Sequence, residues 1–458
     1  MASGGRPSGG RQRPDTHPRP TDPPRRAAFD LLRAVAADGA YANLVLPSML
    51  TERGLSGRDA ALATELGYGT LRCVGTLDEI LAACVDRDLP ALDPAVLDLL
   101  RLGAYQLLRT RIPAHAAVAT TVDLAHATRN GRAAGLVNAV LRRVSSADWE
   151  SWTDRLASGG SAVRRIALRT SHPEWIAEAF ADALGGDLAE TEVALLADDA
   201  RPVTHLVAWP GQVGRDELAV AVGGEPGPYS PYAVRMAGGD PAAFAEIREH
   251  RAAVQDEGSQ LCAIALTRAP LTGPDENWLD LCAGPGGKTA LLAGIAAERG
   301  AHVTANELHP HRAELVRRAV AAWPVDVQVG DARAFQAPTF PVGGYDRILV
   351  DAPCSGLGAL RRRPEARWRR EPADVVDLAA LQAELLAAAL RLVRPGGVVA
   401  YVACSPHLAE TAGVVAGHDL LDARAAFPGV DQLGDGPTVQ LWPHRHGTDA
   451  MFCALIGG

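Results

Sequence analysis

Along the first third of the chain, apolar residues recur at intervals of three and four positions. This spacing places apolar side chains on one face of a helix. It predicts helices within residues 27–35, 60–81, 94–108, 116–127 and 136–144. Asp93 followed by Pro94 is a typical helix start, with Asp as the N-cap and Pro in the first turn. Because strand patterns are scarce here, residues 26–147 are predicted to form an all-α domain.

The pattern changes in the middle of the chain. Residues 148–165 are polar and are predicted to be a linker, and residues 160–250 are predicted to form a small α/β subdomain with a strand at 203–209. From residue 251 to 458, apolar runs typical of buried strands alternate with helical patterns. The expected strands are 277–281, 302–306, 325–329, 346–350 and 398–403, with a terminal pair at 439–442 and 450–456. This alternation predicts a Rossmann-like, doubly wound α/β domain with a mostly parallel sheet.

Composition narrows the class of protein. A length of 458 residues predicts two or three domains, and a net charge of −9 argues against a generally basic protein that coats nucleic acid. Residues 1–25 are rich in Arg, Pro, Gly and Ser and are predicted to be a disordered basic tail. No apolar stretch reaches the roughly 20 residues of a membrane span. The seven cysteines contain no Cys-x-x-Cys pair, so we expect reduced thiols, no metal and a cytoplasmic protein. Nothing in the sequence indicates an obligate dimer, and a monomer is expected.

A glycine-rich turn follows the first strand of the α/β domain. A phosphate-binding loop needs Gly five positions before Gly287, where this chain has Cys282, and a dinucleotide motif needs Gly at 289, where it has Thr. Both patterns fail, which leaves a turn whose backbone approaches a ligand closely. The expected cofactor-binding residues are Cys282, Ala283, Gly284, Pro285, Gly286, Gly287 and Lys288, together with Asp351 at the end of a later strand.

Two carboxylates follow the next strands. Glu307 closes the second strand, where a carboxylate meets ribose hydroxyls, and Asp331 follows the third, where it is placed to accept from an adenine amino group. Each residue alone is more typical of a turn or a cap. Together, without diphosphate-binding features, they favour S-adenosylmethionine over ATP or NAD as the cofactor.

The chain contains one lysine, Lys288, against 44 arginines. Where arginine has replaced lysine almost everywhere, the lysine that remains indicates a site that needs a compact ammonium rather than a forked guanidinium.

Cys354 and Cys404 each follow a predicted buried strand and precede a serine. The carboxyl ends of parallel strands are where α/β sheets bind ligands. Two thiols there suit a pyrimidine, whose carbon 6 accepts a thiolate so that carbon 5 becomes nucleophilic. Asp351 is placed to hydrogen-bond or protonate ring nitrogen 3. The residues alone do not separate the roles of the two thiols, and the other cysteines are interpreted as packing residues.

These motifs resemble those of the bacterial 16S ribosomal RNA cytosine-C5 methyltransferases of the Sun/Fmu type. The similar segments are 254–261, 280–289, 330–333, 351–355, 361–368 and 404–405, and the helical segment ending at 136–142 is similar to a NusB-like RNA-binding domain. The resemblance implies that Cys404 is the covalent nucleophile, that Cys354 assists product release, and that Lys288 supports the cofactor loop and Asp351. It also implies S-adenosylmethionine as cofactor and 16S rRNA, naked or in an early assembly intermediate, as partner.

The chain departs from the family pattern at three places. Gly284 stands where Ala is frequent, which is expected to loosen the turn, and Ala403 stands where Thr is common, which removes a hydroxyl near the site. Residues 449–452, Asp-Ala-Met-Phe, replace Asp-Gly-Phe-Phe and are expected to remove an aromatic ring from the base pocket. Residues 361–370 hold six Arg and one Glu and are expected to contact RNA phosphates, with Trp368 available to stack on a base.

Three other functions remain open. The same chemistry on transfer RNA is the nearest alternative. A DNA cytosine-5 enzyme fits the Pro-Cys dipeptide at Cys354, but the second thiol at Cys404 and the helical domain count against it. A non-catalytic NusB-like RNA-binding or antitermination factor is opposed by the intact set of Asp351, Cys354, Cys404 and Lys288.

Overall fold

The computed structural model describes residues 22–128, 130–334 and 343–458. The chain divides into two compact units, Met1–Trp152 and Thr153–Gly458. The predicted tail lies outside the described residues up to position 21. Its last positions are helical, because the Asp22 side chain accepts from the backbone N–H of Arg25 and α1 begins at Pro23. This is the same Asp-Pro start that the sequence shows at Asp93, which in turn begins α4 at Pro94.

The first unit is helical, as predicted. Its helices are α1 (Pro23–Asp38), α2 (Ala42–Glu52), α3 (Gly57–Ala82), α4 (Pro94–Arg109), α5 (Ala114–Ala127) and α6 (Ala134–Val144). The packing of α3 against α4 depends on Gly69, where an added Cβ would lie 2.0 Å from the Tyr105 hydroxyl oxygen. That hydroxyl donates to Glu65 at 2.7 Å. A glycine therefore sets how closely these two helices approach.

Residues 148–165 are not a linker. They contain most of α7 (Trp149–Leu156), which spans the boundary between the two units, and the start of α8 (Ala162–Arg169). Ser161 caps α8 by accepting from the backbone N–H of Arg164, and Trp152 is buried with its indole N–H donating to the Val144 carbonyl. The polar residues of this stretch are the outer faces and caps of short helices.

A small antiparallel sheet precedes the large one within the second unit. Its order is β2 (Glu225–Pro226), β3 (Ala233–Arg235), β1 (His205–Ala208), β4 (Ala252–Val254). The helices of this stretch, after α8, are α9 (Glu174–Ala183), α10 (Leu188–Asp199), α11 (Arg215–Val222) and α12 (Ala245–Arg248). Across the described ranges of the chain, no helix combines the length and the apolar character needed to cross a bilayer.

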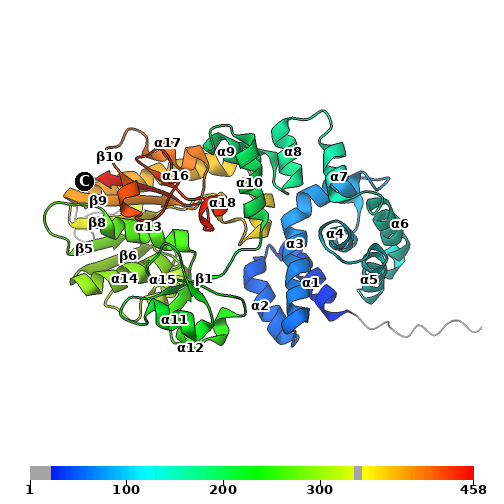
Figure 1. Ribbon diagram of the computed structural model, residues 1–458, viewed down its shortest axis with the longest axis horizontal. Coiled ribbons are helices and arrows are strands. Elements are labelled where there is room, and N and C mark those ends of the chain that lie inside the picture. Colours follow the sequence, from blue (N-terminus) through cyan, green and yellow to red (C-terminus); the bar gives the residue numbers. More distant parts are fainter. Residues whose placement is uncertain (1–21, 129, 335–342) are drawn as a thin grey trace, which may run out of the picture. The chain divides into compact units, whose positions relative to one another are not determined.

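The large sheet is the predicted, mostly parallel one. Its order is β10 (Leu420–Leu421), β12 (Phe452–Gly457), β9 (Val393–Ala403), β8 (Tyr345–Asp351), β5 (Asn277–Asp280), β6 (His302–Glu307) and β7 (Asp326–Val329), and β11 (Val439–Gln440) pairs with β12. Strands β5 to β9 pair in parallel, and β12 is antiparallel to β9. The helices of this part are α13 (Glu257–Arg268), α14 (Gly287–Arg299), α15 (Pro310–Ala319), α16 (Pro372–Leu392), α17 (Ala412–Val415) and α18 (Pro443–His446) (Figure 1).

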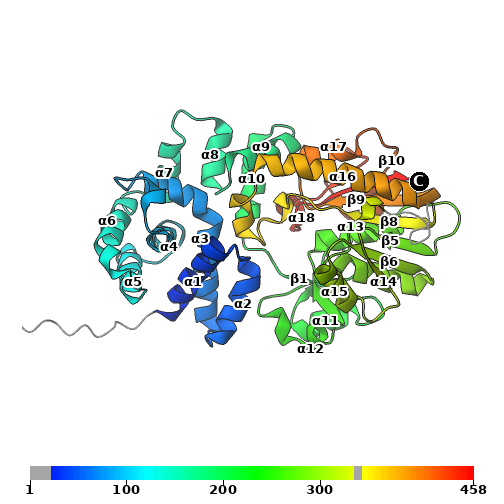
Figure 2. The same cartoon turned by 180° about the vertical axis from the view of Figure 1, so that it is seen from behind.

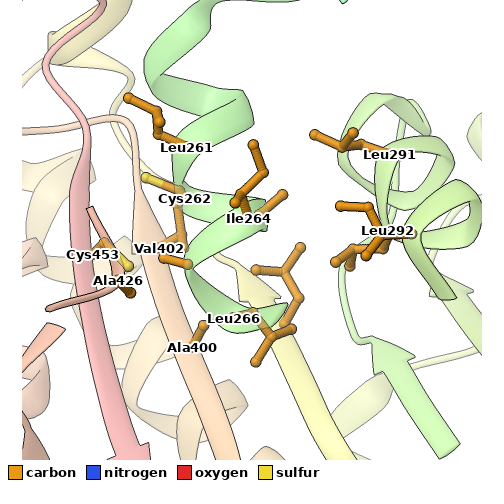
Figure 3. Packing of buried hydrophobic residues seen from close by; sticks show 14 of the residues in the cluster. Leu261, Cys262, Ile264, Leu266, Leu291, Leu292, Ala400, Val402, Ala426 and Cys453 are labelled. Carbon is orange, nitrogen blue, oxygen red and sulfur yellow. The ribbon is translucent and has the colours of Figure 1, made fainter. Parts of the chain in front are cut away.

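Both faces of this sheet are covered. Alternate residues of β9 face opposite sides, so Ala400 and Val402 pack with α13, and Val399 and Tyr401 pack with α16 (Figures 1 and 2). Figure 3 shows α13 between β9 and the apolar face of α14. Because strands buried on both faces carry continuous apolar runs, their polar residues are confined to the ends.

Candidate active site

The large sheet reverses its order at β5. From this strand the chain builds β6 and β7 on one side, and then β8 and β9 on the other. Ligands of open α/β sheets bind beside the carboxyl ends of the strands at such a switch point. Here β5 ends in Asp280 and β8 in Asp351, and β8 and β9 are followed by the segments 352–355 and 404–405.

Lys288 and Asp351 form an ion pair at this switch point. Lys288 lies in the first turn of α14, and its Nζ donates to Oδ2 of Asp351 at 2.8 Å. Burial disfavours the ammonium, but the carboxylate of Asp351 more than offsets this effect, so the pKa of Lys288 is raised. The lone lysine of the chain is therefore a fixed cation beside the strand ends.

The two thiols predicted to carry the chemistry are in contact, with 3.2 Å between the Sγ atoms of Cys354 and Cys404. The hydrogen bond from Cys354 lowers the pKa of Cys404; burial and Asp351 oppose this shift, and Lys288 and Arg363 reinforce it. The same bond raises the pKa of Cys354, and burial and the charge of Glu410 add to the increase. The proton of the pair therefore belongs on Cys354, and Cys404 is the better thiolate. The surroundings separate two thiols that the sequence left equivalent.

The glycine-rich turn packs against the end of β6. The backbone N–H of Gly284 donates to Oε2 of Glu307 at 3.1 Å, and a Cβ at position 284 would lie 2.1 Å from that oxygen. The expectation that Gly284 only loosens the turn was wrong, because the Glu307 carboxylate occupies the space that an alanine would need. Gly286 has a φ of 111°, which favours glycine, and a Cβ there would lie 2.7 Å from Ala319 Cβ.

The other residues of the turn differ in their contacts with the rest of the domain. The backbone N–H of Ala283 donates to the Asn306 carbonyl at 2.8 Å, which joins the turn to β6. The Cys282 thiol packs against the apolar cluster beneath α16, and burial raises its pKa, in accord with a packing role. Pro285 is exposed, and Gly287 begins α14.

Asp280 provides a test of whether the turn fits S-adenosylmethionine. Its Oδ2 accepts from the Thr289 hydroxyl at 2.7 Å, whereas Oδ1 is buried and has no hydrogen-bond partner among the described residues. Burial raises the pKa of Asp280 to about 7. An unpartnered buried carboxylate oxygen beside a ligand turn fits the amino group of S-adenosylmethionine, since buried polar atoms are almost always hydrogen-bonded.

Glu307 and Asp331 differ in how much of each carboxylate is engaged. Glu307 is buried and accepts from the backbone N–H groups of Gly284 and His309, which leaves lone pairs on both oxygens for ribose hydroxyls. Asp331 is more exposed, and both of its oxygens accept from the Arg333 guanidinium, a bond that lowers the pKa of Asp331. Glu307 therefore keeps acceptor sites of the kind that ribose hydroxyls need, and an adenine amino group at Asp331 would share that carboxylate with Arg333.

The basic stretch 361–370 is largely internal. Arg361 and Arg362 both bond to the carboxylates of Asp256 and Asp449, and Arg367 is fully buried and donates to the Ser171 carbonyl. The prediction that this stretch as a whole contacts RNA phosphates was wrong for these three arginines, because they neutralise buried carboxylates and cap a carbonyl. The side chains that face solvent are Arg363, Arg369 and, in part, Trp368 and Arg370.

Two further departures from the family pattern lie in the core. Ala403 is fully buried in the apolar cluster on the α16 side of the sheet, and Met451 is buried in the cluster on the α13 side. Both substitutions therefore change core packing. The expectations that they remove a hydroxyl from the site and a ring from the base pocket were wrong, because both positions lie in the core.

No sequence pattern indicated a role for Asp280 or Glu410. Asp280 lies within the glycine motif, and its only signal was its place as the last residue of a strand. Glu410 is fully buried and accepts hydrogen bonds from Ser355 and Ser405, which follow the two cysteines. It lies at the end of a single-turn helix, Leu408–Glu410, six residues beyond Cys404, where no periodicity indicates burial. Within the described ranges, no group of three His, Cys, Asp or Glu side chains is arranged to hold a metal ion.

The fold and the site together define the class: an α/β methyltransferase domain joined to a helical domain. Comparisons with known proteins agree. Residues 269–457 match the family model described as 16S rRNA methyltransferase RsmB/F, and residues 22–146 match the NusB family.

Relatives span the whole chain. Rv1407 of Mycobacterium tuberculosis (strain ATCC 25618 / H37Rv), named as a methyltransferase, is 56% identical over 447 residues, covering 96% of this chain and 97% of its own. Ribosomal RNA small subunit methyltransferase B of Serratia proteamaculans (strain 568) is 33% identical over 447 residues, covering 93% of this chain and 98% of its own. The crystal structure of PH0851 has the same fold, with a TM-score of 0.78 at 21% identity over 96% of this chain and 99% of its own. The chain belongs to the RsmB/F family of methyltransferases.

Proposed function

We propose that this protein is an S-adenosylmethionine-dependent RNA methyltransferase that forms 5-methylcytosine in 16S ribosomal RNA through a covalent bond between Cys404 and carbon 6 of the base. The observation that carries the proposal is the contact between the two thiols, 3.2 Å apart at adjacent strand ends and beside the Lys288–Asp351 pair. A single thiol in a strand is usually a packing residue. Two in contact, at the ligand-binding edge of the sheet, form a reactive pair.

The chain's own residues account for each step on the base. The Cys404 thiolate adds to carbon 6 and forms a sulfur–carbon bond, which makes carbon 5 nucleophilic. Asp351 is assigned to donate a proton to ring nitrogen 3 as negative charge develops there and to take it back when the Cys404 thiolate leaves, and the Lys288 ammonium stabilises the Asp351 carboxylate between these two steps. After carbon 5 has gained its methyl group, Cys354 takes the remaining proton from carbon 5. The electron pair of that bond then forms the ring double bond and expels the Cys404 thiolate.

The state of Cys354 changes during this cycle. In the free protein, the hydrogen bond to Cys404 is the first cause of its raised pKa. When the Cys404 sulfur is bonded to carbon 6 it no longer carries a negative charge, so this cause disappears and the pKa of Cys354 falls. Cys354 then releases its own proton to solvent more readily and is available as the thiolate that accepts the proton from carbon 5. The thiol contact therefore suits both the first and the last step.

S-adenosylmethionine, when bound, supplies an electrophilic methyl group. The residues proposed to hold it are the turn 282–288, with Glu307 on the ribose, Asp280 on the amino group and Asp331 near the adenine. The target cytosine must leave its stack to reach thiols at a strand end, as in other enzymes that react with a base. Arg363 and Arg369 are exposed and are proposed to contact the RNA backbone.

The substrate assignment is supported by the relatives, since that of Serratia proteamaculans is named a small-subunit ribosomal RNA methyltransferase. The helical unit, which matches the NusB family, is proposed to bind the same RNA, naked or in an early assembly intermediate. We propose that the protein acts as a monomer in the cytoplasm.

The test is transfer of tritium from labelled S-adenosylmethionine to protein-free 16S RNA and to bulk transfer RNA, followed by mass spectrometry of the nucleosides. 5-Methylcytidine in 16S RNA alone is the expected result. Label in transfer RNA alone would keep the chemistry and overturn the substrate. If neither RNA is labelled, the assay is repeated on small-subunit assembly particles, and absence of label there would favour a non-catalytic RNA-binding factor.

A further inference from the structure

Glu410 is a buried carboxylate that the proposed reaction does not use. It ends the short helix η7 (Leu408–Glu410) and is fully buried. Four groups donate to its oxygens. They are the backbone N–H of Ser355 at 2.7 Å, the hydroxyl of Ser355, the hydroxyl of Ser405 at 2.6 Å and Nε2 of Gln382 at 3.2 Å.

The two serines make this arrangement specific to the thiol pair. Ser355 directly follows Cys354 and Ser405 directly follows Cys404. Both hydroxyls donate to the same oxygen, Oε2, and their own oxygens lie 3.2 Å apart. One carboxylate oxygen therefore joins the segments after β8 and β9, one residue away from each sulfur.

A second set of contacts fixes Glu410 itself. The Tyr401 hydroxyl donates to the Glu410 carbonyl at 2.7 Å, and Nε2 of Gln382 also donates to the Pro353 carbonyl at 2.8 Å. Among the described residues, no Arg, Lys or His side chain forms an ion pair with Glu410. Its negative charge is therefore balanced by hydrogen-bond dipoles alone, and it acts on groups nearby.

We propose that Glu410 is a positioning residue for the thiol pair: by accepting from both serines it fixes the separation of the two sulfurs and hence the path of the proton between them. Its charge also opposes ionisation of Cys354, which directs the negative charge to Cys404. The inference rests on the proposed function, in which the two thiols share the steps on the base.

The test measures the thiols directly, without RNA or S-adenosylmethionine. The full-length protein is treated with iodoacetamide between about pH 6 and pH 9, and alkylation of each cysteine is followed by mass spectrometry. Because the thiolate is the nucleophile, the rate reports ionisation. In wild type, Cys404 should react faster than Cys354.

Two variants separate the anchor from the charge. Glu410→Ala removes the common acceptor, and alkylation of Cys404 near neutral pH should fall about tenfold, equivalent to a rise of about one pKa unit. Glu410→Gln retains an acceptor but removes the charge, so Cys354 should gain reactivity and the Cys404-to-Cys354 ratio should fall about threefold to tenfold. Unchanged rates and ratio in both variants would overturn the proposal.

The chain provides its own controls. Cys73, Cys262 and Cys453 are almost fully buried and should stay unlabelled while the protein is folded. If these three cysteines become labelled in Glu410→Ala, that variant is not properly folded, and Glu410→Gln alone tests the proposal. The matched control is Glu257→Gln, since Glu257 is another fully buried carboxylate that accepts from two backbone N–H groups, those of Tyr229 and Ser230. The Glu257→Gln variant should keep the wild-type ratio, and a ratio that falls equally there would overturn the assignment to Glu410.

These rates do not depend on the substrate, so an error in the RNA assignment leaves them unaffected. In the methylation assay, Glu410→Gln should lower kcat and leave KM for RNA unchanged, because Glu410 is buried and acts through the sulfurs. A change in KM alone would contradict a positioning role.

Discussion

The ends of β8 and β9 carry the same dipeptide, Cys-Ser, yet their surroundings differ. The hydrogen bond between the thiols is the first cause of the difference, because it lowers the pKa of Cys404 and raises that of Cys354. Among the charges, Lys288 and Arg363 favour a thiolate at Cys404 and Asp351 opposes it, whereas Glu410 opposes one at Cys354. The sulfurs are 3.2 Å apart, so their shared hydrogen bond and the charges around each sulfur, rather than position in the sheet, distinguish the two thiols. Two identical motifs thus acquire opposite proton preferences from their mutual contact and from charges contributed by other segments.

Removing the nucleophile should have the largest effect on methylation. On the proposed mechanism, Cys404→Ala leaves no thiolate to form the bond to carbon 6, and methylation of 16S RNA should fall by about 10⁴-fold or more, as when a covalent enzyme loses its nucleophile. The measurement is tritium transfer under single-turnover conditions. Retention of methyl transfer would reverse the assignment of the two thiols.

Removing the other thiol should give a different defect. Cys354→Ala retains the Cys404 thiolate, so the bond to carbon 6 forms, but the proton on carbon 5 is removed slowly. Turnover should fall by about 10²- to 10⁴-fold, the usual contribution of a general base, and a protein–RNA adduct should accumulate. The adduct is detected as a slow band on a denaturing gel.

The double variant Cys354→Ala/Cys404→Ala is the control for that adduct and should form none. If Cys354→Ala gives no adduct while turnover falls, the role of Cys354 in release is wrong. Cys404 would then be the reactive thiol, and Cys354 would act only as its neighbour.

The residues at the strand ends could be predicted from the sequence, because parallel strands buried on both faces leave continuous apolar runs and confine polar residues to their ends. That rule placed Asp351, Cys354 and Cys404 at one edge of the sheet, where the structure has them. The proton preference of each thiol was not accessible. It depends on the hydrogen bond between the thiols and on charges around them, including Lys288 and Glu410, and Glu410 reaches Ser355 across 55 residues of sequence.

The same limit explains the error at residues 361–370. A run of arginines is usually a solvated surface, and nothing local indicates burial. Arg361 is buried because Asp256 and Asp449, 105 and 88 residues away, supply carboxylates that would otherwise be unpaired. Gly284 was misjudged for a related reason, since the Glu307 carboxylate that fills its Cβ position belongs to the next strand.

A smaller change should result from replacing the cation beside Cys404. Lys288→Met removes a positive charge that stabilises the thiolate, so alkylation of Cys404 near neutral pH should slow by about tenfold to a hundredfold, in keeping with a shift of one to two pKa units from a neighbouring charge. Lys288→Arg keeps the charge and should lose less in alkylation. Equal rates in wild type and Lys288→Met would show that Lys288 acts only on Asp351.

The end of β5 lies at the same edge of the sheet and carries a carboxylate, Asp280, in place of a thiol. The expected effect of its protonation on ligand affinity is the smallest of the effects predicted. Burial raises the pKa of Asp280 to about 7. If the amino group of S-adenosylmethionine bonds to the ionised carboxylate, then below this pKa the protein must release a proton before it binds the ligand. Affinity should therefore weaken about threefold when the pH falls from about 7.5 to about 6.5.

Isothermal titration calorimetry in buffers of different ionisation enthalpy measures both the affinity and the proton released. Asp280→Asn carries no titrating group, so its affinity should be weaker than that of wild type and should not vary over this range. If wild type shows the same flat profile and releases no proton, Asp280 does not meet the amino group. The buried Oδ1 would then be an unpartnered atom that maintains the turn through Thr289, and the ligand would be held by Glu307 and the backbone. A pH dependence that disappears in Asp280→Asn would show that the third strand end acts on the cofactor as the other two act on the base.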